Sequence, residues 1–242
     1  MKLEADLHTH TIASDGYSTF KEMVESAAQK GLKIIAITDH GLRMDGGPRI
    51  HHFLNIGMWP RAVSGVEVLR GVEANIIDGD GSIDMPEMLL KDLDIVLAGF
   101  HSEAGYSGGS VEENTRAMVG AIKNPYVHII VHPGNPHFPI DAERVILAVK
   151  SYGKALELNN KSFDFRPGSS SNCKLIAKLA HKHKLMVAIN SDSHICYDVG
   201  ECETAIALAK EVGVEEDHIL NSSANLVKNF LARHHAAKPL AS

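Results

Sequence analysis

The motif Asp6-Leu7-His8-Thr9-His10 lies near the start of the chain. Alternate side chains of a β-strand point to the same face, so Asp6, His8 and His10 are expected to share one face of a first strand. Two imidazoles on a rigid strand suit a divalent metal ion, and the neighbouring carboxylate is placed to orient them. Because the chain contains 15 histidines, this motif gains meaning only from the strands that follow it.

Composition sets the broad class of the protein. With 242 residues, of which 44% are hydrophobic and 22% charged, the chain can bury a sizeable core. A net charge of −6 argues against binding long nucleic acid and against attraction to anionic lipid. No apolar run reaches the roughly 20 residues that span a bilayer. We therefore expect a cytoplasmic protein with reduced cysteines and no membrane partner.

Apolar segments with β-branched residues alternate with helical patterns along the chain. Thr19-x-x-Glu22 and Ser110-x-x-Glu113 predict capping boxes, and Asp141 begins a further helix. The expected strands cover residues 3–10, 33–38, 66–76, 95–101, 127–132, 155–159 and 186–190. Near-continuously apolar strands of this kind are typical of parallel sheets that are buried on both faces.

Seven such units favour a single α/β barrel domain over residues 1–242, with 236–242 as a frayed tail. A doubly wound open sheet is the alternative, but it would not gather residues from every strand end into one place. Residues 42–60 show no clear period, and a loop of this length is expected to act as a lid or substrate-binding segment.

Most of the expected strands end in a histidine or an acidic residue. These residues are His8, His10, His40, Glu73, His101, His132, Asp192 and His194, joined by Asp15 in the turn after the first strand. In a barrel they would meet at the carboxyl-terminal rim of the strands. Each one alone is more often a cap or a hydrogen-bonded side chain, but together they would repel without a cation. Nine nitrogen and oxygen ligands are too many for one tetrahedral ion and suggest two or three ions of zinc, manganese or iron.

The motifs Asp-Leu-His-Thr-His, Ser-Asp-Gly, Thr-Asp-His-Gly, Gly-Phe-His, Val-His-Pro-Gly and Ser-Asp-Ser-His, with the isolated Glu73, form a pattern. This pattern resembles the PHP (polymerase and histidinol phosphatase) family from about residue 5 to 196. Within that family the chain is most similar to the small YcdX-type phosphatases, through His-Pro-Gly-Asn-Pro at 132–136 and Glu-Leu-Asn-Asn at 157–160.

The resemblance implies a single distorted (β/α)7 barrel with a trinuclear, usually zinc, centre. It implies one ion near His8, His10, Glu73 and Asp192, with Glu73 bridging to a second ion held by His101 and His132, and a third ion held by Asp15, His40 and His194. Glu73, Asp192 and His194 would also be catalytic. Some relatives have a histidine after the serine turn, where this chain has Asp15-Gly16.

Such a centre is suited to hydrolysing a small phosphate monoester, because a metal lowers the pKa of bound water towards about 7 and supplies hydroxide. Arg166, in a loop after the sixth strand, is the preferred phosphate contact, with Lys161, Arg43 and Arg49 as weaker candidates. His52, in the 42–60 segment, is a further candidate for contacting substrate.

Three other functions stay open. A nucleotide phosphodiesterase or nuclease would use the same ions. An amidohydrolase would usually have eight strands and a bridging lysine in place of Glu73. A non-catalytic metal-binding interaction domain would be expected to lack some of the ligands. Similarity to the family also suggests a homo-oligomer.

Overall fold

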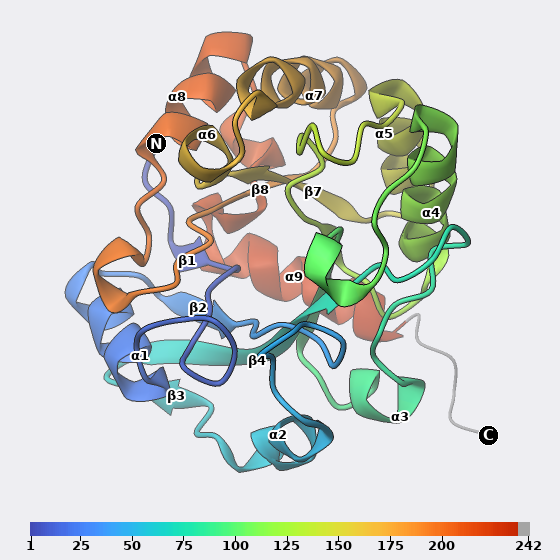
Figure 1. Cartoon of the computed structure of the whole chain (residues 1–242). Coiled ribbons are helices and arrows are strands. Elements are labelled where there is room, and N and C mark those ends of the chain that lie inside the picture. The colour runs from blue at the N-terminus through green and yellow to red at the C-terminus, as the bar shows by residue number, and fades with distance from the viewer. Residues whose placement is uncertain (237–242) are drawn as a thin grey trace.

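The computed structural model describes residues 1–236, and the end of the predicted tail, 237–242, lies outside them. Seven parallel strands form the sheet and curve around the centre of the molecule (Figure 1). In sheet order they are β1 (Ala5–Asp6), β2 (Ile34–Ile37), β4 (Val66–Asn75), β5 (Ile95–Gly99), β6 (Ile129–Ile130), β7 (Ala155–Asn159) and β8 (Val187–Asn190). A short β3 (Ala62–Val63) pairs antiparallel with β4. The predicted seven-stranded barrel is confirmed.

Helices surround this sheet in Figure 1. Their bounds are α1 (Phe20–Gln29), α2 (Ile50–Asn55), α3 (Glu87–Leu90), α4 (Val111–Lys123), α5 (Ala142–Ser151), α6 (Ser162–Phe165), α7 (Ser169–His183), α8 (Glu203–Val212) and α9 (Ala224–Ala236). Short 3-10 helices η1 (Ile56–Met58), η2 (Ser102–Ala104), η3 (Cys196–Asp198), η4 (Glu216–His218) and η5 (Leu220–Ser222) lie between them.

Local capping signals determine where several of these helices begin. Thr19 and Ser110 both form complete capping boxes, and the Asp141 side chain accepts from the backbone N–H of Arg144. The 42–60 segment is more ordered than its sequence predicts, because Phe53 and Ile56 are buried in the core and hold α2 and η1 in place.

Alternation along each strand divides the core into two parts. In β2, Ile34 and Ala36 pack inside the barrel, while Ile35 and Ile37 pack outside with residues of α1. Both faces of the strand are therefore buried, which explains its continuously apolar sequence.

The barrel is closed only loosely between β8 and β1. The backbone contributes one parallel bridge there, between Thr9 and Ser193. Side chains complete the closure: Asn221 donates to the carbonyls of Ala5 and Ile189, and Asn190 accepts from the N–H of Leu7. This junction, which we call the seam, lacks the full hydrogen-bonded ladder of the other strand pairs.

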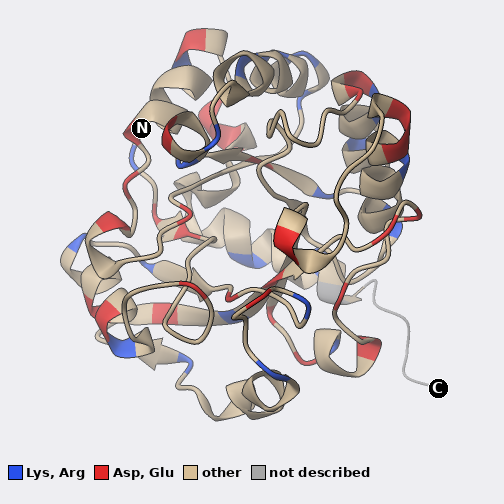
Figure 2. Cartoon of the chain, viewed as in Figure 1, with Lys and Arg blue, Asp and Glu red and all other residues tan. Residues whose placement is uncertain are grey.

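Helix α9 lies behind the strands in Figure 1 and buries Val227, Phe230 and Leu231 against the interior core. Lys and Arg are scattered among Asp and Glu over the molecule (Figure 2). Within residues 1–236, no helix combines the length and apolarity needed to cross a membrane.

Replacing Phe230 by alanine should remove the largest side chain that α9 contributes to the interior core. We expect the free energy of unfolding to fall by about 3–5 kcal/mol. Urea unfolding followed by circular dichroism measures this change. Tyr197→Ala, at a side chain that is 77% exposed, is the control and should change stability by less than about 0.5 kcal/mol. Equal stability of the two variants would contradict the proposed packing role of α9.

Candidate metal centre

The carboxylate of Glu73, near the end of β4, lies at the centre of the barrel rim and is only 1% exposed. Five imidazoles lie near its two oxygens: His132 Nε2 at 2.7 Å, His101 Nε2 and His40 Nδ1 at 3.1 Å, His8 Nε2 at 3.3 Å and His10 Nε2 at 3.4 Å. They come from four other strand ends, so the barrel brings together residues that are distant in sequence.

Asp192, just after β8, is a second carboxylate beside His8 and His10. Its Oδ1 is 3.5 Å from His8 Nε2 and 3.4 Å from His10 Nε2. Its Oδ2 accepts hydrogen bonds from Asn159 Nδ2 at 2.9 Å and Arg166 Nη2 at 3.2 Å. Asp192 therefore connects the histidine pair to a guanidinium at the edge of the site.

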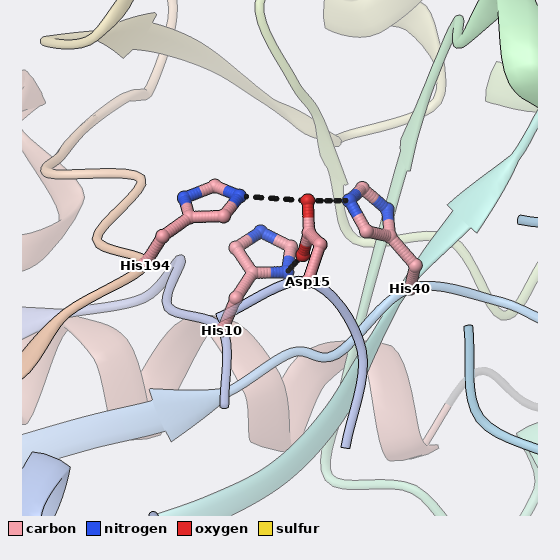
Figure 3. A group of neighbouring side chains, drawn as sticks. All are labelled: His10, Asp15, His40 and His194. Carbon is pink, nitrogen blue, oxygen red and sulfur yellow. Dashed lines mark hydrogen bonds and ion pairs between the residues drawn. The ribbon is translucent and has the colours of Figure 1, made fainter. Parts of the chain in front are cut away.

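Asp15 forms a third group with histidines from three different segments (Figure 3). Its Oδ2 is 3.1 Å from His194 Nε2 and 3.4 Å from His40 Nε2, and its Oδ1 is 3.6 Å from His10 Nδ1. In Figure 3 the Asp15 carboxylate lies between the rings of His194 and His40. Asp15 thus occupies the position predicted for it in the turn after the first strand.

All nine residues predicted as ligands meet in one connected cluster. Three overlapping groups in it have ligand atoms within 4.8 Å of one another: His8, His10 and Glu73; His40, Glu73 and His101; and His10, Asp15, His40 and His194. His132 and Asp192 adjoin these groups through the contacts above.

The donor set fits a divalent ion. The ring atoms His10 Nδ1 and His101 Nδ1 are buried without a hydrogen-bond partner among the described residues. His8 Nε2 and His10 Nε2 face each other at 3.1 Å, and both also face carboxylates. Convergent buried donors of this kind are costly unless a cation binds them. Imidazole nitrogen with carboxylate oxygen, and no thiolate, fits zinc, manganese or iron.

Burial and neighbouring charge shift the pKa values of the cluster. Burial and the adjacent His40 lower the pKa of His10 to about 4, and burial with the nearby Arg166 lowers that of His132 to about 4. Burial opposes the charge of Glu73, yet its histidine neighbours hold its pKa well below the usual range. For His194 burial is outweighed by the Asp15 and Asp192 carboxylates, which raise the pKa to about 9. At neutral pH, His10 and His132 are therefore neutral and able to bind a metal.

Two of the cluster residues, His132 and Asp192, have unusual backbone geometry that directs their side chains into the cluster. His132 and Asp192 have φ angles of +32° and +57°, in a region that non-glycine residues rarely adopt. Gly99 makes room for the imidazole of His132, because a Cβ at residue 99 would lie 2.6 Å from His132 Cε1. The histidine after β6 thus reaches Glu73 through a local departure from strand geometry.

Glu157, in β7, is a functional residue that the sequence reasoning missed. Its Oε1 is 2.8 Å from His8 Nδ1, and its Oε2 accepts from the backbone N–H of His132 at 2.9 Å. Asp6 was expected to orient the imidazoles, but its carboxylate instead accepts from Ser191 and Gly200 and reaches only the backbone N–H of His8. The sequence signal that could have identified Glu157 is the Glu-Leu-Asn-Asn stretch at 157–160.

Asp39 was also missed, although it belongs to the Thr-Asp-His-Gly motif. It accepts from the N–H of Thr11 at 2.7 Å, the hydroxyl of Thr11 at 2.8 Å and the hydroxyl of Ser14 at 2.7 Å. These bonds fix the turn that presents Asp15.

The candidate substrate contacts differ in position. Arg166 lines a cavity of about 350 Å³ over the cluster, together with Met44 and Asp45 of the predicted 42–60 segment. His52 does not line this cavity; its ring packs against Phe53 and Trp59, with Nε2 3.7 Å from Asp39. The geometry thus supports Arg166 and gives no support to His52. Lys161 lines a neighbouring cavity together with Arg166, and none of Lys161, Arg43 and Arg49 is among the residues of the cavity over the cluster.

A parallel barrel with imidazoles and carboxylates gathered at the carboxyl-terminal rim defines a barrel protein of the metal-dependent hydrolase class. The model of the PHP domain matches residues 6–197, and the chain belongs to this family. The family predicted from the sequence motifs is confirmed.

Relatives extend the similarity over nearly the whole chain. A probable phosphatase of Caldanaerobacter subterraneus subsp. tengcongensis is 50% identical over 233 residues, covering 96% of this chain and 92% of the relative. A probable phosphatase of Clostridium botulinum strain Hall is 42% identical over 241 residues and covers 99% of both chains. The predicted enzyme class, a phosphatase, is supported by these relatives.

Among solved structures, the fold is similar to that of histidinol phosphate phosphatase from Lactococcus lactis subsp. lactis Il1403, with a TM-score of 0.62. The match covers 89% of this chain and 95% of the other, at 17% identity, and that structure contains zinc, L-histidinol and phosphate. At this identity the match supports the barrel fold.

Glu157→Gln tests whether Glu157 orients His8. The amide keeps one acceptor oxygen but loses the charge and turns an NH2 group towards donors at the other position, so we expect metal affinity to fall about 10- to 100-fold. Competition with a chelator measures the affinity. Glu211→Gln, at an exposed carboxylate that pairs with Lys174, is the matched control and should leave affinity unchanged. Unchanged affinity in Glu157→Gln would exclude the orienting role.

Proposed function

We propose that the protein is a phosphatase that cleaves phosphate monoesters of small molecules at a centre of three metal ions, most simply zinc. The observation that carries this proposal is the meeting of nine residues with nitrogen and oxygen donors, Glu73 among them, in one connected cluster with Arg166 beside it. The relatives named as phosphatases support the reaction class, and the zinc in the solved histidinol phosphate phosphatase supports the metal.

Residues would divide among the ions as their contacts suggest. His8, His10, Glu73 and Asp192 would hold one ion; Glu73, His101 and His132 a second; and Asp15, His40 and His194 a third. Manganese or iron would fit the same donors. When bound, such ions lower the pKa of water and offset the charge of a phosphoryl group.

Side chains of the protein would orient the metal ions and the substrate. The two oxygens of Glu73 face different histidines, which suits a bridging carboxylate. Asp192 holds the Arg166 guanidinium over the cavity, where its planar fork can bind two phosphoryl oxygens. The His194 side chain is 31% exposed, the most open of the histidines in the cluster, and lies where substrate would enter. These contacts give Glu73, Asp192 and His194 their proposed catalytic roles.

Substrate size follows from the cavity over the cluster. Its volume of about 350 Å³ admits a phosphoryl group with a small organic part, and the chain carries a net charge of −6. Both features favour a small phosphorylated molecule over long nucleic acid. A single domain over the whole chain, a cytoplasmic location and a homo-oligomer stay predictions.

The first test is phosphate release from p-nitrophenyl phosphate by zinc-loaded protein, with bis(p-nitrophenyl) phosphate assayed alongside. We expect faster turnover of the monoester than of the diester. A chelator should abolish this turnover, because the ions must offset the charge of the dianionic phosphoryl group. Faster diester turnover would instead indicate a nucleotide phosphodiesterase. No turnover of either ester by protein with measured metal content would indicate a non-catalytic binding domain.

Arg166→Lys tests the phosphate contact. Lysine keeps the charge but loses the bidentate geometry, so we expect kcat/KM for the monoester to fall about 10- to 100-fold, with most of the change in KM. Arg144→Lys, at an exposed arginine paired with Glu112, is the control. A variant with unchanged KM would remove Arg166 from the proposed site.

A further inference from the structure

A second cavity opens beside the cluster on the Arg166 side. Its volume is about 590 Å³, and four of its lining residues, Asp15, Arg166, Asp192 and His194, also line the cavity over the metal cluster. A phosphoryl group held by the cluster and Arg166 would therefore direct its organic part into this second cavity. The volume lies within the usual range of about 300–1,000 Å³ for small-molecule pockets.

Two aromatic rings line the outer part of this second cavity. Tyr17 is 81% exposed and Phe165 is 71% exposed, although both belong to well-anchored segments. The N–H of Tyr17 donates to the carbonyl of His194 at 2.6 Å, and the ring of Phe165 lies 5.1 Å from Lys161 Nζ. Exposed aromatic side chains at the mouth of a pocket offer flat apolar surface to a ligand.

In the outer part of this cavity, which is lined by Tyr17, Lys161, Phe165, Ile195 and Asp198, the one positive and the one negative side chain neutralise each other. Lys161 Nζ lies 2.5 Å from the Asp198 carboxylate, and Ile195 adds a further apolar side chain. Arg166 is already directed towards the cluster through Asp192. Among the described residues that line this outer part, a leaving group with a second phosphate would meet only one cation, Lys161, which is already paired with Asp198.

We infer that this second cavity, walled by Tyr17 and Phe165, binds an uncharged aromatic or heteroaromatic leaving group. The preferred substrates are thus phosphate monoesters of aromatic alcohols, and bisphosphates are poor substrates. This inference rests on the proposed phosphatase activity and adds the substrate class to it.

The test compares benzyl phosphate with propyl phosphate on zinc-loaded enzyme. Both release a primary alcohol of similar basicity, so a difference in kcat/KM reports recognition of the ring rather than intrinsic reactivity. We expect benzyl phosphate to be preferred. Phe165→Ala and Tyr17→Ala should each lower kcat/KM for benzyl phosphate about five- to twentyfold, mainly through KM, and leave propyl phosphate within about twofold.

Control variants separate ring contact from general damage. Tyr197→Ala removes an aromatic ring that is 77% exposed in the same region but does not line this cavity, and it should leave both substrates unchanged. Phe165→Tyr keeps the ring and should keep the preference. Both Phe165 and Tyr17 are exposed, so their replacement should not impair folding.

The outcomes distinguish the two proposals. Equal turnover of benzyl and propyl phosphate would overturn the aromatic pocket and leave the phosphatase intact. A benzyl preference that survives both alanine variants would also overturn the assignment to Tyr17 and Phe165. Failure to hydrolyse either ester, in protein with measured zinc, would overturn the phosphatase itself and this inference with it.

Discussion

The carboxylate of Glu73, buried and surrounded by imidazoles from five positions, is the interaction on which the rest of the rim depends. A charge that is 1% exposed is stable only when opposite or polar groups converge on it. Convergence requires several strands to end at one height, which a closed parallel barrel provides. Smaller features follow from it: the positive φ of His132, and the absence of a side chain at Gly99 where the His132 ring lies.

Much of the fold could be predicted from local signals. The run Ile34–Ile37 is apolar at every position because alternate residues enter different cores, and the caps at Thr19, Ser110 and Asp141 depend on neighbouring residues alone. The helix α2 was not predicted, because its short sequence has no clear period and is held by burial of Phe53. Tertiary contact, rather than propensity, determines that element.

The site was predictable to the extent that strand ends reveal it. Side chains at the ends of parallel strands must meet, so the ligand set follows once the strands are identified. The carboxylate that orients His8, that of Glu157, could not be identified from the strand ends. β1 ends at Asp6, so the alternation that would align Asp6 with His8 and His10 fails there, and Glu157 from a strand 149 residues away takes the contact with His8. Partners at such separation leave no periodic trace in the sequence.

The loosely closed seam between β8 and β1 has a functional consequence. Asp15 and Tyr17 follow β1, while His194 and Ile195 follow β8, so each side of the seam contributes residues to the cluster and to the second cavity. The two segments are bonded to each other, with the N–H of His10 donating to the carbonyl of Ser193 at 2.8 Å and that of Tyr17 to His194 at 2.6 Å. Glu73 itself lies in the fully hydrogen-bonded part of the sheet, where β4 pairs with β5. The seam therefore supplies metal donors as well as contacts for the leaving group, and the bonds between its two segments hold these side chains together where the barrel ladder is incomplete.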